Sequence, residues 1–292
     1  MIRSRVFRWA DLDGLLAVWE ASALSLAGQS FAGPEQFVRQ WQSGGAWAER
    51  DLWVAEDGGG IVGYGGLRPW HSPGWLQGEV VVHPEWRGRG VGSALLQQLV
   101  QEAAGRGQRY LGATAPDHPP EVGRFLQSRG FEPFIPRLHL RLRPVVVPGY
   151  QVVRGHRVRP AGREESALLA EVTNAAYGPS ERVGPADAEG YRRYLEGSGQ
   201  VVGLCETYGR QVAIDGVTQT SGHIASLAIL PDHRRRGLGR WLLARGIRYC
   251  QQKDWPTVEL NVDRDNQPAR RLYENVGFQP VYAYTVYRLP LA

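Results

Sequence analysis

The sequence contains few cysteines and no long apolar run, and these absences exclude several classes of protein. Cys205 and Cys250 are its two cysteines, too few for a disulfide framework and without the spacing of a metal site. No run of about 18 apolar residues occurs, so we expect no membrane span. Residues 1–8 are charged and enter no apolar stretch of signal-peptide length. Together these features predict a protein of the reducing cytoplasm, with no metal and no membrane partner.

The composition is that of a folded, basic protein. Hydrophobic residues make up 42% and charged residues 22% of the 292 residues, which is typical of a globular chain. That length favours two domains, because single cores seldom grow beyond about 250 residues. The formal charge of +5 suits an anionic ligand. It also permits nucleic acid, but no recognition motif is present, so we expect no nucleic-acid partner.

One stretch of the second half has the pattern of a phosphate-binding turn. Ile224–Ile229 is predicted to be a strand, residues 230–240 form a small basic turn, and a helix should begin near Trp241. Free backbone N–H groups at such a helix start can hold a phosphate or pyrophosphate. A P-loop would need Gly-Lys-Ser/Thr, which is absent. A dinucleotide fingerprint would need a third glycine where Leu242 stands, so neither of these alternatives fits.

The same series of strand, turn and helix occurs twice. Three landmarks recur at one offset of 147 residues: Pro84 and Pro231, Arg87 and Arg234, and the pairs Gly130-Phe131 and Gly277-Phe278. A constant offset predicts two copies of one domain. Prolines resist helix and central strand, so residues 144–149 are the predicted join. The predicted domains are residues 1–145 and 150–292.

The elements of each copy are also predicted. The first copy should contain a hairpin over 52–56 and 61–67, a strand over 75–82, a helix over 93–104, a strand over 110–115, a helix over 121–129 and a return strand from 130 towards 142. The second copy should contain a helix around 164–172, a loop over 178–188 near the substrate entrance, two antiparallel strands between 200 and 222, and a strand over 258–262.

Two motifs flank the strands of the second copy. Arg234, Gly237 and Gly239 fit Arg/Gln-x-x-Gly-x-Gly/Ala after a strand. The run Asn-x-x-Ala-x-x-x-Tyr-x-x-x-Gly-Phe is met by Asn266, Ala269, Tyr273, Gly277 and Phe278. This pair of motifs resembles the GNAT superfamily of acetyl-CoA-dependent N-acetyltransferases. The resemblance implies an α/β fold of two tandem GNAT-like domains, each a mixed, mostly antiparallel twisted sheet flanked by helices, with acetyl-CoA as co-substrate and no metal.

The resemblance also assigns coenzyme-binding positions in the second copy. The strand would line the pantetheine arm, the turn would bind the pyrophosphate mainly through N–H groups, and the second motif would flank the coenzyme. These positions are Leu227, Ala228, Ile229, Arg234, Arg235, Arg236, Gly237, Leu238, Gly239, Arg240, Asn266, Ala269, Arg270 and Arg271. We interpret Gly237 and Gly239 as places where a Cβ would obstruct the ligand.

Acyl transfer to an amine needs a base for the amine and an acid for the leaving thiolate. By the resemblance, Tyr273 is the acid. Family members often have a glutamate eight residues before the proline of the turn; here that position is His223, whose ordinary pKa suits the role. The alternative is a solvent-exposed histidine at a strand end. Glu259 and Asn261 are further candidates on the next strand, with Asn261 better suited to holding substrate, and a water chain could replace any of them.

The first copy departs from the pattern. It keeps the coenzyme strand and turn, at Val80, Val81, Val82, Arg87, Gly88, Arg89, Gly90, Val91, Gly92 and Ser93. Leu126 stands at the acid position and Leu76 at the base position, and leucine cannot carry protons. Glu79 would serve as a base only if a bulge turned it inward. We therefore interpret the first copy as structural, or as a coenzyme binder without turnover.

These features predict an acetyltransferase that moves the acetyl group of acetyl-CoA to a primary amine of a small molecule or peptide. Transfer would be direct, in a ternary complex, with the active site in the C-terminal domain. The layout is similar to the mycothiol synthase family, tandem proteins that acetylate an amino-sugar thiol precursor, and that acceptor is one alternative. A non-catalytic coenzyme-A-binding sensor is another. The chain would act as a monomer or a homodimer.

Overall fold

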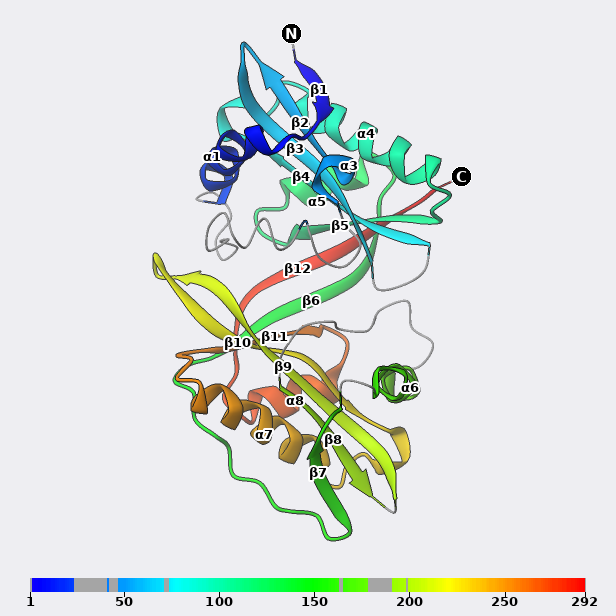
Figure 1. Ribbon diagram of the computed structural model, residues 1–292, viewed down its shortest axis with the longest axis vertical. Helices are drawn as coiled ribbons and strands as arrows, with labels where there is room; N and C mark the ends of the chain where they lie inside the picture. The colour runs from blue at the N-terminus through cyan, green and yellow to red at the C-terminus, as the bar shows by residue number, and fades with distance from the viewer. Residues whose placement is uncertain are drawn as a thin grey trace. The chain divides into compact units, whose positions relative to one another are not determined.

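The computed structural model describes residues 2–23, 41, 47–70, 74–162, 165–177, 191–197 and 199–291 (Figure 1). Contacts divide the chain into two compact units. The first unit consists of residues 1–135, 212–218 and 284–292, and the second of residues 136–211 and 219–283. The predicted loop over 178–188 lies outside the described residues. Each unit is a sheet flanked by helices, as the sequence predicts.

The sheet of the first unit has the strand order β1-β2-β3-β4-β5-β12. Its strands are β1 Arg3–Val6, β2 Leu52–Asp57, β3 Gly60–Pro69, β4 Trp75–Val82, β5 Tyr110–Pro116 and β12 Gln279–Pro290. The pairs β1–β2, β2–β3, β3–β4 and β5–β12 are antiparallel, and β4 pairs with β5 in parallel. Its helices are α1 Leu12–Ala23, α3 Ala48–Asp51, α4 Val91–Gly105 and α5 Glu121–Gln127, with single 3₁₀ turns at Trp9–Asp11 and Pro84–Trp86.

The sheet of the second unit has the order β6-β11-β10-β9-β8-β7. Its strands are β6 Glu132–Leu142, β7 His156–Pro160, β8 Tyr191–Gly197, β9 Gln200–Ile214, β10 Val217–Ile229 and β11 Val258–Asp263. The helices are α6 Ser166–Tyr177, α7 Leu238–Gln252 and α8 Gln267–Glu274, with a 3₁₀ turn at Pro231–His233. β10 and β11 are parallel, and β11 with β6 is antiparallel.

Each sheet contains a strand from the other half of the sequence. β6 precedes the proline-rich join, yet its residues 137–142 pair with β11 in the second unit. β12 ends the chain, yet its residues 284–290 pair with β5 in the first unit. Both strands follow a Gly-Phe pair, at 130 and at 277. The last strand of each sequence repeat therefore completes the sheet of the other.

Most predicted elements are present, with two shifts that have a local cause. α4 and α7 begin two and three residues earlier than predicted, each directly after a glycine in the left-handed region, Gly90 (φ 85°) and Gly237 (φ 81°). Glycine adopts this conformation without a Cβ penalty, so it can precede the first helical residue. β10 begins at Val217 because Asp215 and Gly216, both at positive φ, form a tight turn after β9.

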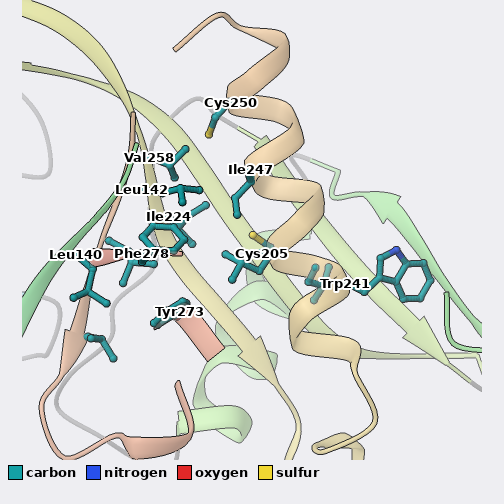
Figure 2. Close-up of a cluster of buried hydrophobic side chains, with 14 of the residues drawn as sticks. Leu140, Leu142, Cys205, Ile224, Trp241, Ile247, Cys250, Val258, Tyr273 and Phe278 are labelled. Carbon is teal, nitrogen blue, oxygen red and sulfur yellow. The ribbon is translucent and has the colours of Figure 1, made fainter. Parts of the chain in front are cut away.

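The core of the second unit lies between α7 and its sheet (Figure 2). Leu238, Leu242 and Ile247 of α7 are buried against Ile224 of β10 and Leu260 of β11. Cys205 and Cys250 belong to this cluster, and burial raises the pKa of both thiols to about 12, so they remain protonated. No helix of the described residues is long and apolar enough to cross a membrane.

Candidate active site

β10 and β11 separate in the middle of the second unit's sheet. They pair over three positions, Gly222 with Val258, His223 with Glu259 and Ile224 with Leu260. Both strands then continue, to Ile229 and to Asp263, with no further pair between them in the described residues. On β10 the Leu227 and Ile229 carbonyls accept from the side chains of Tyr177 and Arg234. The other backbone groups of the separating edges need another partner, so an extended ligand can add there as a strand would. β4 and β5 likewise pair only over residues 75–77 and 110–112.

The turn after β10 leads into a helix start with unpaired N–H groups. The first bond of α7 runs from the Trp241 N–H to the Gly237 carbonyl, at 3.1 Å. The N–H groups of Leu238, Gly239 and Arg240 precede it, so they have no acceptor within the helix and can face an anion. A Cβ on Gly239 would meet Leu272 at 3.5 Å, an ordinary contact. The protein itself therefore leaves room there, and close approach of a ligand stays a prediction.

Arg234 holds the turn rather than reaching outward. Its Nε donates to the Ile229 carbonyl at 3.0 Å, its Nη2 to the Ala176 carbonyl, and its backbone N–H to the Pro231 carbonyl. Arg87 makes the matching bond in the first unit, from Nε to the Val82 carbonyl at 3.3 Å. In both copies the arginine ties the helix approach to the end of the strand. Any role of Arg234 towards a phosphate would then come from the shape of the turn.

The remaining basic residues of the turn differ in how they are held. Arg235 has φ 61°, where the first copy has Gly88 at φ 73°. Arg236 donates to the Asp232 carbonyl at 3.0 Å, and Arg240 to the Gly149 carbonyl at 2.7 Å. These contacts fix two of the side chains close to the turn.

The second motif forms the start of α8. The Asn266 side chain accepts from the Ala269 N–H at 3.2 Å, which is an N-cap. Arg270 donates to the Arg264 carbonyl at 3.1 Å, and Arg271 is exposed. On β10, Leu227 and Ile229 pack against the α7 core, whereas Ala228 packs with Val172 of α6. The predicted coenzyme residues thus line both faces of the strand and the start of the next helix.

A buried carboxylate organises the other face of the sheet. Glu259 is 1% exposed; its Oε1 accepts from Arg141 at 2.8 Å and its Oε2 from Arg210 at 3.0 Å. His139 lies alongside, with Nε2 at 3.6 Å from Oε1. Burial alone would raise the pKa of Glu259, but His139 and the two arginines lower it to about 2. Glu259, predicted to bind substrate, has both oxygens engaged by protein.

His223 lies beside this network and is not an exposed strand-end residue. It is 8% exposed, its ring lies 5.3 Å from that of Tyr208, and its Nδ1 has no hydrogen-bond partner among the described residues. Burial first, then the positive charge of Arg210, lowers the pKa of His223 to about 3. The imidazole is therefore neutral near pH 7 and keeps a lone pair.

Tyr273 comes from α8 and lies in the apolar cluster (Figure 2). Its ring meets Phe278 edge-on, with centroids 5.8 Å apart. Burial, and to a lesser extent nearby Tyr177 and Cys205, raise the pKa of Tyr273 above its usual value, so the phenol stays protonated. Tyr177, at the end of α6, donates its hydroxyl to the Leu227 carbonyl at 2.9 Å, on the predicted pantetheine strand.

Two stretches of the chain match acetyltransferase families. Residues 48–133 match the Acetyltransferase (GNAT) domain, and residues 173–278 the Acetyltransferase (GNAT) family. A mycothiol acetyltransferase of Thermomonospora curvata is 31% identical over 252 residues, which cover 82% of each chain. This chain belongs to the GNAT family of acetyltransferases. A mycothiol acetyltransferase of Thermobispora bispora is 29% identical over 95% of this chain and 96% of its own.

Solved GNAT structures share the fold along the whole chain. A GCN5-related N-acetyltransferase from Sphaerobacter thermophilus superposes with a TM-score of 0.78, at 19% identity, over 99% of this chain and 96% of that one. A tandem GNAT protein from the clavulanic acid biosynthesis pathway gives a TM-score of 0.72, at 18% identity, over 100% and 99%. Such low identities establish the tandem GNAT fold alone.

The first GNAT unit has apolar or paired groups at the positions equivalent to the predicted catalytic residues. Leu76 and Leu126 are buried in its core. Glu79 accepts from the Tyr64 hydroxyl at 3.0 Å and from Arg68 at 3.3 Å. At the start of α4, Ser93 accepts from Arg129. The described residues therefore place neither an acid nor a base where the second unit has Tyr273 and His223.

Three residues of the polar network are missing from the sequence-based prediction. His139 and Arg141 alternate on β6, and Arg210 lies on β9. None belongs to a GNAT motif, and polar residues at alternate positions also occur on any strand with one wet face. The alternation of polar residues on β6 is the signal that the sequence contains. It identifies these residues only once the pairing of β6 with β11 is known.

Proposed function

We propose that this GNAT protein transfers the acetyl group of acetyl-CoA to the primary amine of the deacetylated, amino-sugar thiol precursor of mycothiol. Transfer is direct, in a ternary complex, at one active site in the C-terminal domain. The relatives named mycothiol acetyltransferase support this acceptor, since one matches over nearly the full length of both chains. The observation that carries the reaction is the separation of β10 from β11 immediately before the open helix start of α7.

The residues at this separation suit acetyl-CoA. The edge of Leu227–Ile229 offers its backbone N–H groups to the pantetheine amides, while the Leu227 and Ile229 carbonyls already accept from Tyr177 and Arg234. The N–H groups of Leu238–Arg240 offer an anion site to the pyrophosphate. Arg235 adds positive charge within that turn. On this proposal the Tyr177 hydroxyl exchanges the Leu227 carbonyl for another acceptor when pantetheine binds.

The chemistry needs two protons to move. The amine nitrogen attacks the thioester carbonyl, the C–N bond forms, and the C–S bond breaks as the coenzyme leaves. We assign the proton for the departing thiolate to Tyr273, which burial keeps protonated. The amine proton passes to water that His223 holds by accepting a hydrogen bond, and from that water to solvent, because the conjugate acid of His223 is strongly disfavoured.

The first domain, on this proposal, has no turnover of its own. Its helix start keeps the geometry of the coenzyme turn, with Gly88 and Gly90 at positive φ, but Leu76 and Leu126 replace the base and the acid. It supports the fold and supplies strand β6 to the second sheet.

The test combines calorimetry with an acetylation assay on the intact chain. Acetyl-CoA should bind, and incubation with the deacetylated precursor should give the acetylated product by mass spectrometry. Acetylation of other amines but not of the precursor would disprove the acceptor and keep the reaction. Failure to bind acetyl-CoA would disprove both.

A further inference from the structure

Asn261 lies at the point where β10 and β11 separate. It is the first residue of β11 beyond the last pair, Ile224 with Leu260. Side chains alternate along a strand, so Asn261 shares a face with Glu259 and, through the parallel register, with His223. Glu259 and His223 are buried, whereas Asn261 is exposed. Asn261 is thus an exposed polar side chain of this face at the point where the two strands separate.

His139, on the neighbouring strand, contacts the Asn261 amide. The two residues are direct partners across β6 and β11, and the His139 Nδ1 lies 3.0 Å from the Asn261 Oδ1. The imidazole is 2% exposed and stacks on Tyr282, with ring centroids 4.7 Å apart and planes 17° apart. These contacts fix the ring plane.

The second ring nitrogen does not compete for this role. The His139 Nε2 lies 3.6 Å from the Glu259 Oε1, which is beyond hydrogen-bond length. The Glu259 carboxylate is already engaged by Arg141 and Arg210 at 2.8 and 3.0 Å. Asn261 is therefore the shorter contact of the His139 ring, through Nδ1, and Glu259 lies at ion-pair distance from Nε2.

We infer that His139 is a positioning residue that turns the Asn261 NH₂ group towards the substrate that accepts the acetyl group. The NH₂ group then donates a hydrogen bond to an oxygen atom of that substrate. An amide oxygen only accepts hydrogen bonds, so Nδ1 of His139 must carry the hydrogen, in the neutral or the doubly protonated ring. With the oxygen held by His139, the NH₂ branch points away from it and can only donate. The substrate group that pairs with the Asn261 NH₂ is therefore a hydroxyl or carbonyl oxygen, not an ammonium or an N–H.

This inference rests on the proposed function and adds to it a residue from outside the matched family regions. His139 lies on β6, in the first half of the sequence, whereas the family match of the second half begins at residue 173. The active site therefore depends on a strand that precedes the join between the two repeats.

Four variants of the intact chain test the role in turnover. Asn261→Ala and His139→Leu should each raise KM for the deacetylated mycothiol precursor by about 3- to 10-fold, the effect of losing one hydrogen bond. Asn261→Asp should raise it further, because a carboxylate cannot donate. His139→Gln should keep the KM for the precursor close to the wild-type value, since the NH₂ of the glutamine can donate to Asn261. KM for acetyl-CoA should not change in any of the four.

The matched control is Arg137→Gln. Arg137 lies on the same strand and face, and pairs with Asp263 at 3.0 Å. It should lower stability slightly and leave the acceptor KM unchanged. Unchanged acceptor KM in both Asn261→Ala and His139→Leu would overturn the inference, as would equal effects of His139→Leu and His139→Gln.

A second measurement does not need turnover. Nitrogen-15 NMR of His139 in the free protein should show Nδ1 protonated, with that signal altered in Asn261→Ala. A lone pair at Nδ1 would overturn the inference, because Asn261 would then donate to the ring and present its oxygen to the opening. If the precursor is not acetylated while Nδ1 is protonated, the proposed acceptor fails and the orientation of Asn261 stands.

Discussion

Burial sets the protonation of the two candidate catalytic residues in opposite directions. It raises the pKa of Tyr273 and lowers that of His223 to about 3, so both side chains are neutral near pH 7. The phenol keeps a proton to give, and the imidazole keeps a lone pair that can accept a hydrogen bond from water. Each shift also makes the group a weaker acid or base than its ordinary pKa would, so both roles depend on positioning as well as on protonation.

Replacement of Tyr273 by phenylalanine tests the acid. The ring would still fill its place against Phe278, so acetyl-CoA affinity and the unfolding temperature should stay close to those of the wild type. The value of kcat should fall by about 10- to 1000-fold, because the departing thiolate loses its proton donor. Steady-state rates and calorimetry on the same preparation measure both quantities. An unchanged kcat would remove Tyr273 from the mechanism.

His223 gives a pH dependence whose sign follows from its lowered pKa. Above the ordinary value of 6.5 the histidine is neutral in both states, and stability is complete. As the pH falls from 6.5 towards 3, His223 binds a proton in the unfolded chain but not in the folded chain, so the free energy of unfolding decreases. The loss should reach about 2 kcal/mol near pH 5, at about 1.4 kcal/mol for each pH unit.

His223→Gln should lack that loss. Urea unfolding of both proteins at pH 7.5 and pH 5 gives the difference, since the other histidines are common to the two. Glu259 acts in a lower window, between its ordinary 4.5 and about 2, and so does not enter at pH 5. Identical pH dependence in the two proteins would show that His223 is not excluded from solvent.

At the level of elements, β6, β9 and β11 are joined by ion pairs of unequal burial. Glu259 is 1% exposed, but the side chains of Arg141 and Arg210 are 20% and 36% exposed. An arginine that loses Glu259 can turn towards water, whereas the carboxylate cannot. Removal of the arginines should therefore cost more than removal of the acid.

The double variant Arg141→Met with Arg210→Met should lower the free energy of unfolding by about 3–5 kcal/mol, as an uncompensated buried charge does. Glu259→Gln should lower it by only about 1–2 kcal/mol, the cost of imperfect hydrogen bonding at a buried group. Urea denaturation of the three proteins at neutral pH gives the comparison. The reverse order would mean that water reaches Glu259 in solution.

The sequence predicted these elements well where a local signal exists. β4 has the predicted bounds, because its apolar run ends at a proline and a glycine-containing turn that are visible in the sequence. The network around Glu259 could not be predicted, because it depends on which strand lies beside β11. His139 and Arg141 are distant in sequence from Glu259, and the residues around them contain no signal that indicates this pairing.

At the level of the whole molecule, the same limit explains the exchanged strands. β6 and β12 follow equivalent Gly-Phe pairs, so the local sequence does not indicate which sheet each strand joins. Long-range pairing decides the outcome: β6 joins β11, and residues 284–290 of β12 join β5. The repeat of 147 residues is visible in the sequence, but the partner of each last strand is not.

This exchange predicts that the chain can be cut without coming apart. A protease site inserted after Val152, which is 66% exposed, would separate β1–β6 from β7–β12. Each fragment would still hold a strand of the other's sheet, with six register pairs between β6 and β11 and seven between β12 and β5. Releasing either fragment would expose the open edges of both sheets, which is costly in water.

After cleavage, size-exclusion chromatography should therefore show one species with the elution volume of the intact chain, and calorimetry should show unchanged acetyl-CoA binding. The fragments should separate only in denaturant, with a single unfolding transition. A chain cut at an exposed loop within one repeat, between Gly58 and Gly59 of the β2–β3 hairpin, is the control for the insertion itself. Separation of the fragments in native buffer would show that the two repeats close their own sheets in solution, and His139 could not then hold Asn261.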